Sequence, residues 1–127
     1  MALEQQRPKR KATGSLYKKC KDKRKKQLSR QFSATKVGEK KIVKIRTLGG
    51  NGKNRIQKIN YASILDNKTK KIEKMTILKV LENSANRHYV RMGIITKGSI
   101  VELENGKKAR ITSSPGQHGT INGIILE

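Results

Sequence analysis

The sequence predicts a mainly β fold: a small closed or nearly closed β-barrel of about six strands, preceded by a basic, extended N-terminal arm. Short runs of Ile and Val recur about every ten residues with turn-forming residues between them, a pattern typical of small barrels and sandwiches. Hydrophobic residues make up only 33% of the chain and Trp is absent, so the core must be small and aliphatic. We expect two parts, residues 1–36 as the arm and residues 37–127 as the barrel domain.

The arm lies in the half of the chain that carries most of the positive charge. Residues 1–58 contain 20 Lys and Arg against three acids, a net charge of +17, whereas residues 59–127 contain 11 against six, a net charge of +5. Cations as dense as those of residues 18–26 (KKCKDKRKK) oppose compact structure, and such segments stay disordered until a partner supplies counter-charge. We therefore expect the arm to be disordered in the free protein and to order on a polyanion.

The first strands of the barrel domain are expected on either side of a glycine-rich segment. Residues 41–48 (KIVKIRTL) are rich in β-branched residues, and residues 49–52 (GGNG) end that strand because glycine readily adopts positive φ. Residues 56–65 alternate loosely and end at a turn signal, residues 66–69 (DNKT). Residues 71–81 (KIEKMTILKVL) then form the returning strand of a β-hairpin.

Four further strands are expected in the second half of the domain. They cover residues 94–97, 99–104, 107–112 and 120–126. Asn105 and Gly106 are the strongest hairpin signal in the chain. The polar segments 82–91 and 113–119 are expected to be loops. The core is expected to come from the aliphatic residues Ile42, Ile45, Ile59, Ile64, Ile72, Ile77, Leu78, Ile94, Ile100, Leu103, Ile111, Ile121 and Ile124.

Several functional classes lack the residues that they require. No apolar run approaches the ~18 residues of a membrane-spanning helix, and we expect no membrane partner, with attachment of the basic arm to an anionic membrane surface as the physical alternative. The single Cys20 can neither form an intrachain disulfide nor complete a zinc site. His88 and His118 sit in polar segments without metal-ligand spacing, and no nucleophile, base and orienting group stand together. We expect no enzyme activity, no cofactor, no metal and no small-molecule substrate.

Residues 48–55 (LGGNGKNR) suggest a phosphate-binding loop. The nucleotide-binding P-loop pattern is not met, because Asn54 follows Gly52 and Lys53 where Ser or Thr is required. Backbone amides of such a loop can still bind phosphate without nucleotide chemistry, and the neighbouring Lys53 and Arg55 favour an RNA phosphate. A plain turn is the alternative, since glycines serve turns generally.

The dense positive charge indicates nucleic-acid binding, because each phosphate that a cation neutralises releases condensed counterions. No helix-turn-helix, zinc-finger or basic-zipper signature is present, which disfavours the common DNA-binding classes. The arm is expected to contact mainly phosphates, which gives affinity with little sequence choice. Its expected contact residues are Arg7, Lys9, Arg10, Lys11, Lys18, Lys19, Lys23, Arg24, Lys25, Lys26 and Arg30. Tyr17 offers a stacking surface for an unpaired base.

The barrel domain contains three polar clusters, and the first of them, around the glycine-rich loop, is expected to fix the register of the RNA. They are Arg46, Asn51, Lys53 and Arg55 around the glycine-rich loop, then Asn86, Arg87, His88 and Arg91, and finally Gln117 with His118. Such loops can read exposed base edges or riboses, as is common in single-stranded RNA recognition. They can equally be barrel turns that face solvent or a protein neighbour, because loop polarity is only a correlation.

Four segments taken together are similar to a known protein family. They are residues 10–17 (RKATGSLY) with the basic run 23–26, residues 44–55 (KIRTLGGNGKNR), residues 82–97 (ENSANRHYVRMGIITK) and residues 109–119 (ARITSSPGQHG). Their order and spacing resemble the eight-e family of small-subunit ribosomal proteins, and the short length resembles its archaeal members. The resemblance implies a compact β-barrel with a basic extension that threads ribosomal RNA, without enzyme activity or a cofactor.

The leading hypothesis is therefore a structural constituent of the small ribosomal subunit. Its expected partners are small-subunit ribosomal RNA and neighbouring ribosomal proteins, and its expected location is the cytoplasm. A free-standing RNA chaperone or nucleic-acid packaging protein is the alternative from another class. An RNA-processing enzyme is a third hypothesis, but the sequence contains no catalytic cluster that would support it.

Overall fold

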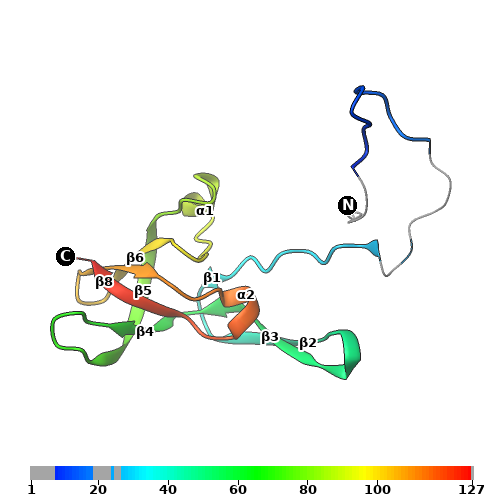
Figure 1. Cartoon of the computed structure of the whole chain (residues 1–127). Helices are drawn as coiled ribbons and strands as arrows, with labels where there is room; N and C mark the ends of the chain where they lie inside the picture. The colour runs from blue at the N-terminus through cyan, green and yellow to red at the C-terminus, as the bar shows by residue number, and fades with distance from the viewer. Residues whose placement is uncertain (1–7, 19–23, 25–26, 127) are drawn as a thin grey trace. The chain divides into compact units, whose positions relative to one another are not determined.

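A computed structural model describes residues 8–18, 24 and 27–126 (Figure 1). The chain divides into two units, residues 1–32 and 33–127. Among the described residues, every β-strand lies in the second unit. The elements in chain order are β1 (Lys36–Val37), β2 (Lys41–Arg46), the 3₁₀ turn η2 (Leu48–Gly50), β3 (Gly52–Ile59), β4 (Tyr61–Leu65), β5 (Ile72–Glu82), α1 (His88–Arg91), β6 (Ile100–Leu103), β7 (Lys108–Ile111), α2 (Pro115–His118) and β8 (Asn122–Leu126).

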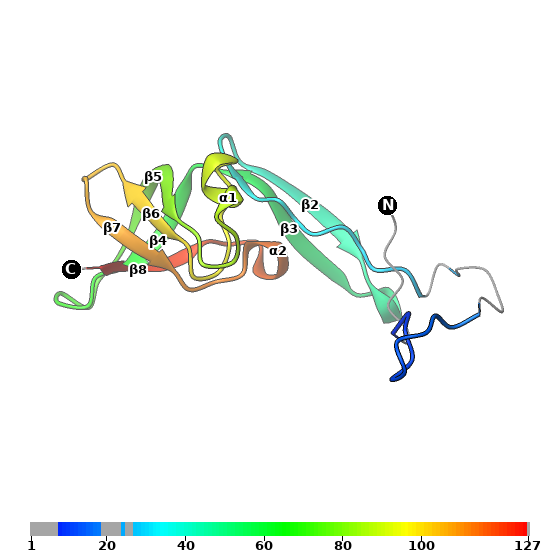
Figure 2. The same cartoon turned by 90° about the horizontal axis from the view of Figure 1, so that it is seen from above.

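The strands of the second unit form two sheets. A three-stranded sheet has the order β1–β3–β2, with β1 parallel and β2 antiparallel to β3. The other five strands close a barrel in the order β4–β5–β6–β7–β8, which the parallel pairing of β4 with β8 completes. The β2–β3 hairpin extends away from the barrel (Figure 2). The hairpin therefore presents residues that the barrel does not cover.

The predicted mainly β fold and the closed barrel are confirmed, with five strands in the barrel where about six were expected. The two predicted hairpins are present as β4–β5 and β6–β7. Gly106 in the second turn has a φ of 71°, which glycine adopts without strain. In the first turn, the Lys68 N–H donates a 2.9 Å hydrogen bond to the Asp66 carboxylate. This bond is the main reason why the pKa of Asp66 lies below its ordinary value.

Two strand predictions are wrong. Residues 56–65 do not form one strand but the end of β3 and all of β4, because the chain passes from one sheet to the other at Asn60. Residues 94–97 form no strand, and Ile94 makes only an isolated bridge to Lys36. Ile94 and Ile95 are nevertheless buried, so their apolar pattern reflects burial and not strand pairing. The two predicted loops each contain a single helical turn, α1 and α2.

The strand register determines which residues face into the barrel. One row of residues, each paired with the next across neighbouring strands, runs around the barrel. It consists of Ile72, Leu65, Ile124, Arg110, Ile100 and Glu82. None of the six is buried, so the row lies on the outer face. The row returns to β5 ten residues beyond its start, from Ile72 to Glu82, because the strands of a closed barrel are tilted and staggered.

The core is small and aliphatic, as predicted, but its membership differs in part. The predicted residues Ile59, Ile64, Ile77, Ile94, Leu103, Ile111 and Ile121 are buried. Three predictions are wrong, since Ile42, Ile72 and Leu78 are exposed. Ile45, Ile100 and Ile124 are half-buried. Buried residues that were not predicted are Ile56, Ala62, Met75, Val80, Ile95, Val101 and Ala109.

Gly123 permits close packing at the seam of the barrel. A Cβ atom at this position would lie 3.0 Å from the Arg110 carbonyl oxygen and 3.0 Å from Ile64 Cδ1. Both distances are tighter than ordinary van der Waals contact, so the absence of a side chain lets β8 pack beside β4 and β7.

Replacing the fully buried Ile64 with Ala should lower the free energy of unfolding by about 2–5 kcal/mol, because it leaves a cavity in the core. Ile72→Ala is the matched control, since Ile72 is 71% exposed and truncation there should change stability by no more than about 0.5 kcal/mol. Chemical denaturation of both variants measures the difference. Equal losses would contradict the assignment of inner and outer barrel faces.

Candidate nucleic-acid interface

The described part of the basic extension forms a small cationic turn. Arg10 makes an isolated antiparallel bridge with Leu16, and the Tyr17 N–H donates to the Lys9 carbonyl at 3.2 Å. Gly14 has a φ of 84° at the turn, and the Arg10 guanidinium donates to its carbonyl at 2.7 Å. Local backbone hydrogen bonds therefore fold residues 9–18 into a turn that holds their cations close together.

The cations predicted to contact RNA are exposed wherever the structure describes them in the extension. They are Lys9, Arg10, Lys11, Lys18, Arg24 and Arg30. The Lys11 ammonium lies 5.7 Å from the centroid of the Tyr17 ring, within the range of a cation–π interaction, and Tyr17 is 39% exposed. The predicted residues Arg7, Lys19, Lys23, Lys25 and Lys26 lie outside the described residues.

The glycine-rich segment is the tip of the β2–β3 hairpin. Gly49 and Gly50 have φ values of 73° and 79°, which explains why glycine occupies both positions. The Thr47 N–H and hydroxyl both donate to the Asn51 carbonyl, at 2.6 and 2.9 Å. The Asn51 side-chain amide donates to the Leu48 carbonyl at 3.1 Å. Asn51 was predicted to contact RNA, but its amide group is used to close the turn.

The first and third predicted clusters meet at β3. The Lys53 ammonium donates a 3.0 Å hydrogen bond to the Gln117 side-chain oxygen, although the two residues are 64 positions apart. Gly119, directly after α2, approaches β3 so closely that a Cβ atom there would lie 2.8 Å from Asn54 Cβ. His118 is exposed beside this contact. The hairpin and the α2 turn therefore form one polar surface.

The hairpin presents cations beyond those that the sequence singled out. Lys44 and Arg46 occupy alternate positions of β2, hence one face of the strand, and both are exposed. Arg55 is half-buried and pairs with Val43 across the hairpin. Lys44 was not predicted as a site residue. The alternation of cations with Ile and Val in residues 41–46 is the signal that could have identified it.

The second predicted cluster lies on α1 and the residue pair before it. The Asn86 side-chain oxygen accepts a 2.9 Å hydrogen bond from the His88 N–H, so this side chain supports the start of the helical turn. Arg87, His88 and Arg91 are exposed. This cluster occupies a different part of the fold from the hairpin tip (Figures 1 and 2).

Asn83 fixes the loop that carries this second cluster. Its side-chain amide donates to the Ile94 carbonyl at 3.1 Å. Its side-chain oxygen accepts from the Ala85 N–H and from the Thr96 hydroxyl, both at 3.0 Å. Asn83 is buried, so these bonds satisfy an amide that would otherwise be costly to desolvate. The sequence did not identify this role, because nothing local distinguishes Asn83 from the exposed polar residues around it.

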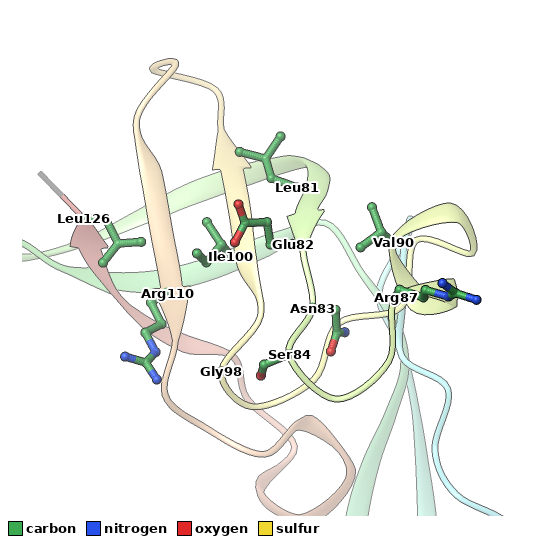
Figure 3. Close-up of a pocket in the computed structure, with 10 residues that line it drawn as sticks. All are labelled: Leu81, Glu82, Asn83, Ser84, Arg87, Val90, Gly98, Ile100, Arg110 and Leu126. Carbon is green, nitrogen blue, oxygen red and sulfur yellow. The ribbon is translucent and has the colours of Figure 1, made fainter.

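An open pocket of about 700 Å³ lies between this loop and the outer face of the barrel (Figure 3). The apolar part of the pocket lining comes from Leu81, Ile100 and Leu126. Two charged lining residues, Arg87 and Arg110, lie on opposite sides of the pocket. Arg110, which the sequence did not single out, therefore lines the same pocket as Arg87 of the second cluster.

The described part of the chain offers neither a metal site nor a membrane-spanning helix. Its His, Cys, Asp and Glu residues form no group of three or more that could hold a metal ion. No helix within residues 8–18, 24 and 27–126 is both long enough and apolar enough to cross a membrane.

Comparison with known proteins gives consistent matches over nearly the whole chain. Residues 4–126 match the family model of ribosomal protein S8e. The small ribosomal subunit protein eS8 of Nanoarchaeum equitans is 45% identical over 123 residues, which is 97% of this chain and 96% of that protein. The protein of the same name from Methanobrevibacter smithii is 44% identical over 126 residues, 99% and 100% of the two chains. That of Methanococcus aeolicus is 43% identical over 127 residues, 99% and 98%.

Gly119→Ala should separate the α2 turn from the hairpin. Gly119 and Gly106 have nearly the same positive φ, 70° and 71°, but only at Gly119 would the new Cβ atom meet a neighbour. Each Ala substitution should cost about 1–2 kcal/mol from the left-handed backbone alone. Gly119→Ala should lose a further ~1–3 kcal/mol from overpacking against Asn54. Denaturant titration of the two variants tests this, and equal losses would rule out the close contact at β3.

Proposed function

The chain belongs to the ribosomal protein S8e family, and from this premise we propose that it is a structural, non-enzymatic constituent of the small ribosomal subunit. In that role it binds ribosomal RNA, contacts neighbouring ribosomal proteins and supports translation in the cytoplasm. The observation that carries the proposal is the match over residues 4–126, which includes the cationic extension, the hairpin tip and the barrel together.

The basic extension is proposed to supply most of the RNA affinity. It comprises residues 1–36, and its described cations are exposed on long, flexible side chains that can follow a phosphate backbone. Each phosphate contact releases counterions, so binding through the extension depends strongly on salt and weakly on sequence. Tyr17, partly exposed beside Lys11, is proposed to stack on an unpaired base.

The surface shared by the hairpin tip and α2 is proposed to fix the register of the RNA. Arg46 and Lys53 lie on the hairpin, and Gln117 and His118 on the α2 turn. The hydrogen bond between Lys53 and Gln117 favours one arrangement of these side chains before RNA arrives. Preorganised polar groups of this kind lose less conformational entropy on binding, which favours selectivity over general affinity.

The α1 cluster is proposed as the third contact. Arg87, His88 and Arg91 are exposed, and Asn86 and Asn83 hold the loop that presents them. A preformed loop of this kind can meet either RNA or a protein neighbour.

A permanent component of the small subunit should remain with that particle when weaker RNA-binding proteins are removed. In a sucrose gradient of cell lysate at high salt, the chain should sediment with the small subunit. A free-standing RNA chaperone or packaging protein should instead shift to the light fractions as salt weakens its phosphate contacts. Recovery of the chain only in the light fractions at high salt would overturn the proposed function.

Paired substitutions separate the roles of the extension and the hairpin. Lys9→Gln with Lys18→Gln removes two positive charges from the extension, and should weaken binding to cognate and unrelated RNA alike. The slope of log affinity against log salt should become shallower by about one to two units. Arg46→Gln with Arg55→Gln removes the same charge from the hairpin, and should mainly reduce the preference for the cognate ribosomal fragment.

Filter binding to both RNAs over a range of salt concentrations measures these quantities. The same proportional change in affinity, salt slope and preference for both pairs would contradict the proposed division between extension and hairpin.

A further inference from the structure

Three lysines lie side by side where the three-stranded sheet approaches the barrel. Lys36 of β1 and Lys41 of β2 are both paired in register with Lys58 of β3. Adjacent strands are about 4.8 Å apart, so the three residues span only about 10 Å across the sheet. All three are exposed. Like charges directly opposite one another on neighbouring strands repel, so these lysines lower the stability of the free protein.

Two further lysines converge on the adjacent Tyr61. The Lys74 ammonium lies 4.1 Å from the centroid of the Tyr61 ring, and the Lys40 ammonium lies 5.7 Å from it. The pKa of the Tyr61 phenol is lowered, chiefly because Lys40 donates a hydrogen bond to it, while burial acts in the opposite direction. A neutral phenol that accepts from Lys40 still carries its own proton, which it can donate to an anion.

The two groups belong to one region of the chain. Lys40 directly precedes Lys41, and only Asn60 separates the end of β3 from Tyr61 at the start of β4. We call this group the junction lysine cluster. It consists of Lys36, Lys40, Lys41, Lys58, Tyr61 and Lys74.

Within the described part of the protein, no carboxylate forms a direct ion pair with a lysine of this cluster. This holds even for Glu39 and Glu73, which are close to it in sequence. Lys79 elsewhere on β5 is different, because its ammonium lies 3.0 Å from Glu102. A polyanion that neutralised the junction lysine cluster would remove the repulsion between its members and release counterions.

We propose that the junction lysine cluster is a further phosphate-binding site, which holds the backbone of ribosomal RNA at the junction of the sheet and the barrel. This inference rests on the proposed function, since it adds a contact surface to the same RNA-bound state. The cluster has the chemistry of backbone binding, namely flexible point charges and one hydroxyl donor, and it lacks the forked donors that read base edges.

The cluster is distinct from the hairpin tip, because the two lie at opposite ends of the β2–β3 hairpin. Lys41 and Arg46 are the first and last residues of β2, about 17 Å apart at roughly 3.4 Å per residue. Lys44 lies between them. Because side chains alternate along a strand, Lys41 faces the opposite side of β2 from Lys44 and Arg46, so the cluster and the cations near the tip are separate surfaces.

The test compares two triple variants of the full chain that lose the same charge. The site variant carries Lys36→Gln, Lys41→Gln and Lys58→Gln. The control carries Lys70→Gln, Lys71→Gln and Lys97→Gln, which are also exposed lysines. Binding to a transcript of small-subunit ribosomal RNA is measured over a range of salt concentrations. The slope of log affinity against log salt should become shallower by about two to three units for the site variant, and by less than one unit for the control.

A second variant keeps the test decisive if the triple site variant fails to fold by circular dichroism. Lys40→Gln with Lys74→Gln leaves the lysine row of the sheet intact and should make the slope shallower by about one to two units. Salt slopes that match the control for every foldable site variant would overturn the inference. So would a site variant that binds the transcript like the control but fails to enter small subunits, because the cluster would then serve a protein neighbour.

Failure of the inference can be distinguished from failure of the proposed function. If the wild-type chain binds the transcript and only the contrast between site and control variants is missing, this inference alone is wrong. If the wild-type chain shows no affinity for the transcript, the proposed function is wrong and the inference is overturned with it.

Discussion

Self-repulsion among 31 lysines and arginines is the constraint that the rest of the structure accommodates. Among the residues that the structure describes, no Lys or Arg is buried, and the core inside the five strands excludes water with fully buried Ile, Val and Leu. The cations lie elsewhere, on the extension, the hairpin, the turns and the outer barrel face. Closure of the barrel also leaves no exposed strand edge within that sheet, so the edges of the described strands that remain are on β2 and on β1, where Ile94 bridges Lys36. Lys36, Lys41 and Lys44 occupy those two strands and disfavour pairing with another chain.

Local patterns predicted the elements whose geometry is decided locally. Asn105 and Gly106 specify a tight turn by their own backbone preferences, and the residues on either side therefore pair as expected. Asn60 carries no comparable signal, yet it divides residues 56–65 between two sheets. That division depends on β8, whose residues pair with β4 from far along the chain. Sequence periodicity contains no information about such long-range pairing.

One error in the predicted core, Leu78, has a specific cause in β5. The register with β6 shifts between Ile77 and Lys79, so the inward positions are Ile77 and Val80, three residues apart and not two. This irregularity turns Leu78 outward. An uninterrupted alternation that includes Val80 would have placed Leu78 on the inner face.

The candidate interface, like the core, could be predicted only in part from the sequence. Charge density identified the cations, whereas the contact between Lys53 and Gln117 and the row formed by Lys36, Lys41 and Lys58 arise only from tertiary pairing.

The parallel pairing of β4 with β8 has a consequence for how the chain matures as it is made. Ser63 pairs with Asn122, 59 residues later, so the barrel cannot close until those later residues have been synthesised. At typical rates of translation this interval lasts roughly 3–12 s. The residues before β4, with their large excess of positive charge, leave the synthesising ribosome before any closed core exists. During this interval the nascent chain is cationic and its strands are unpaired, and unpaired strands tend to aggregate. Early binding of RNA or a chaperone would therefore protect the chain from aggregation.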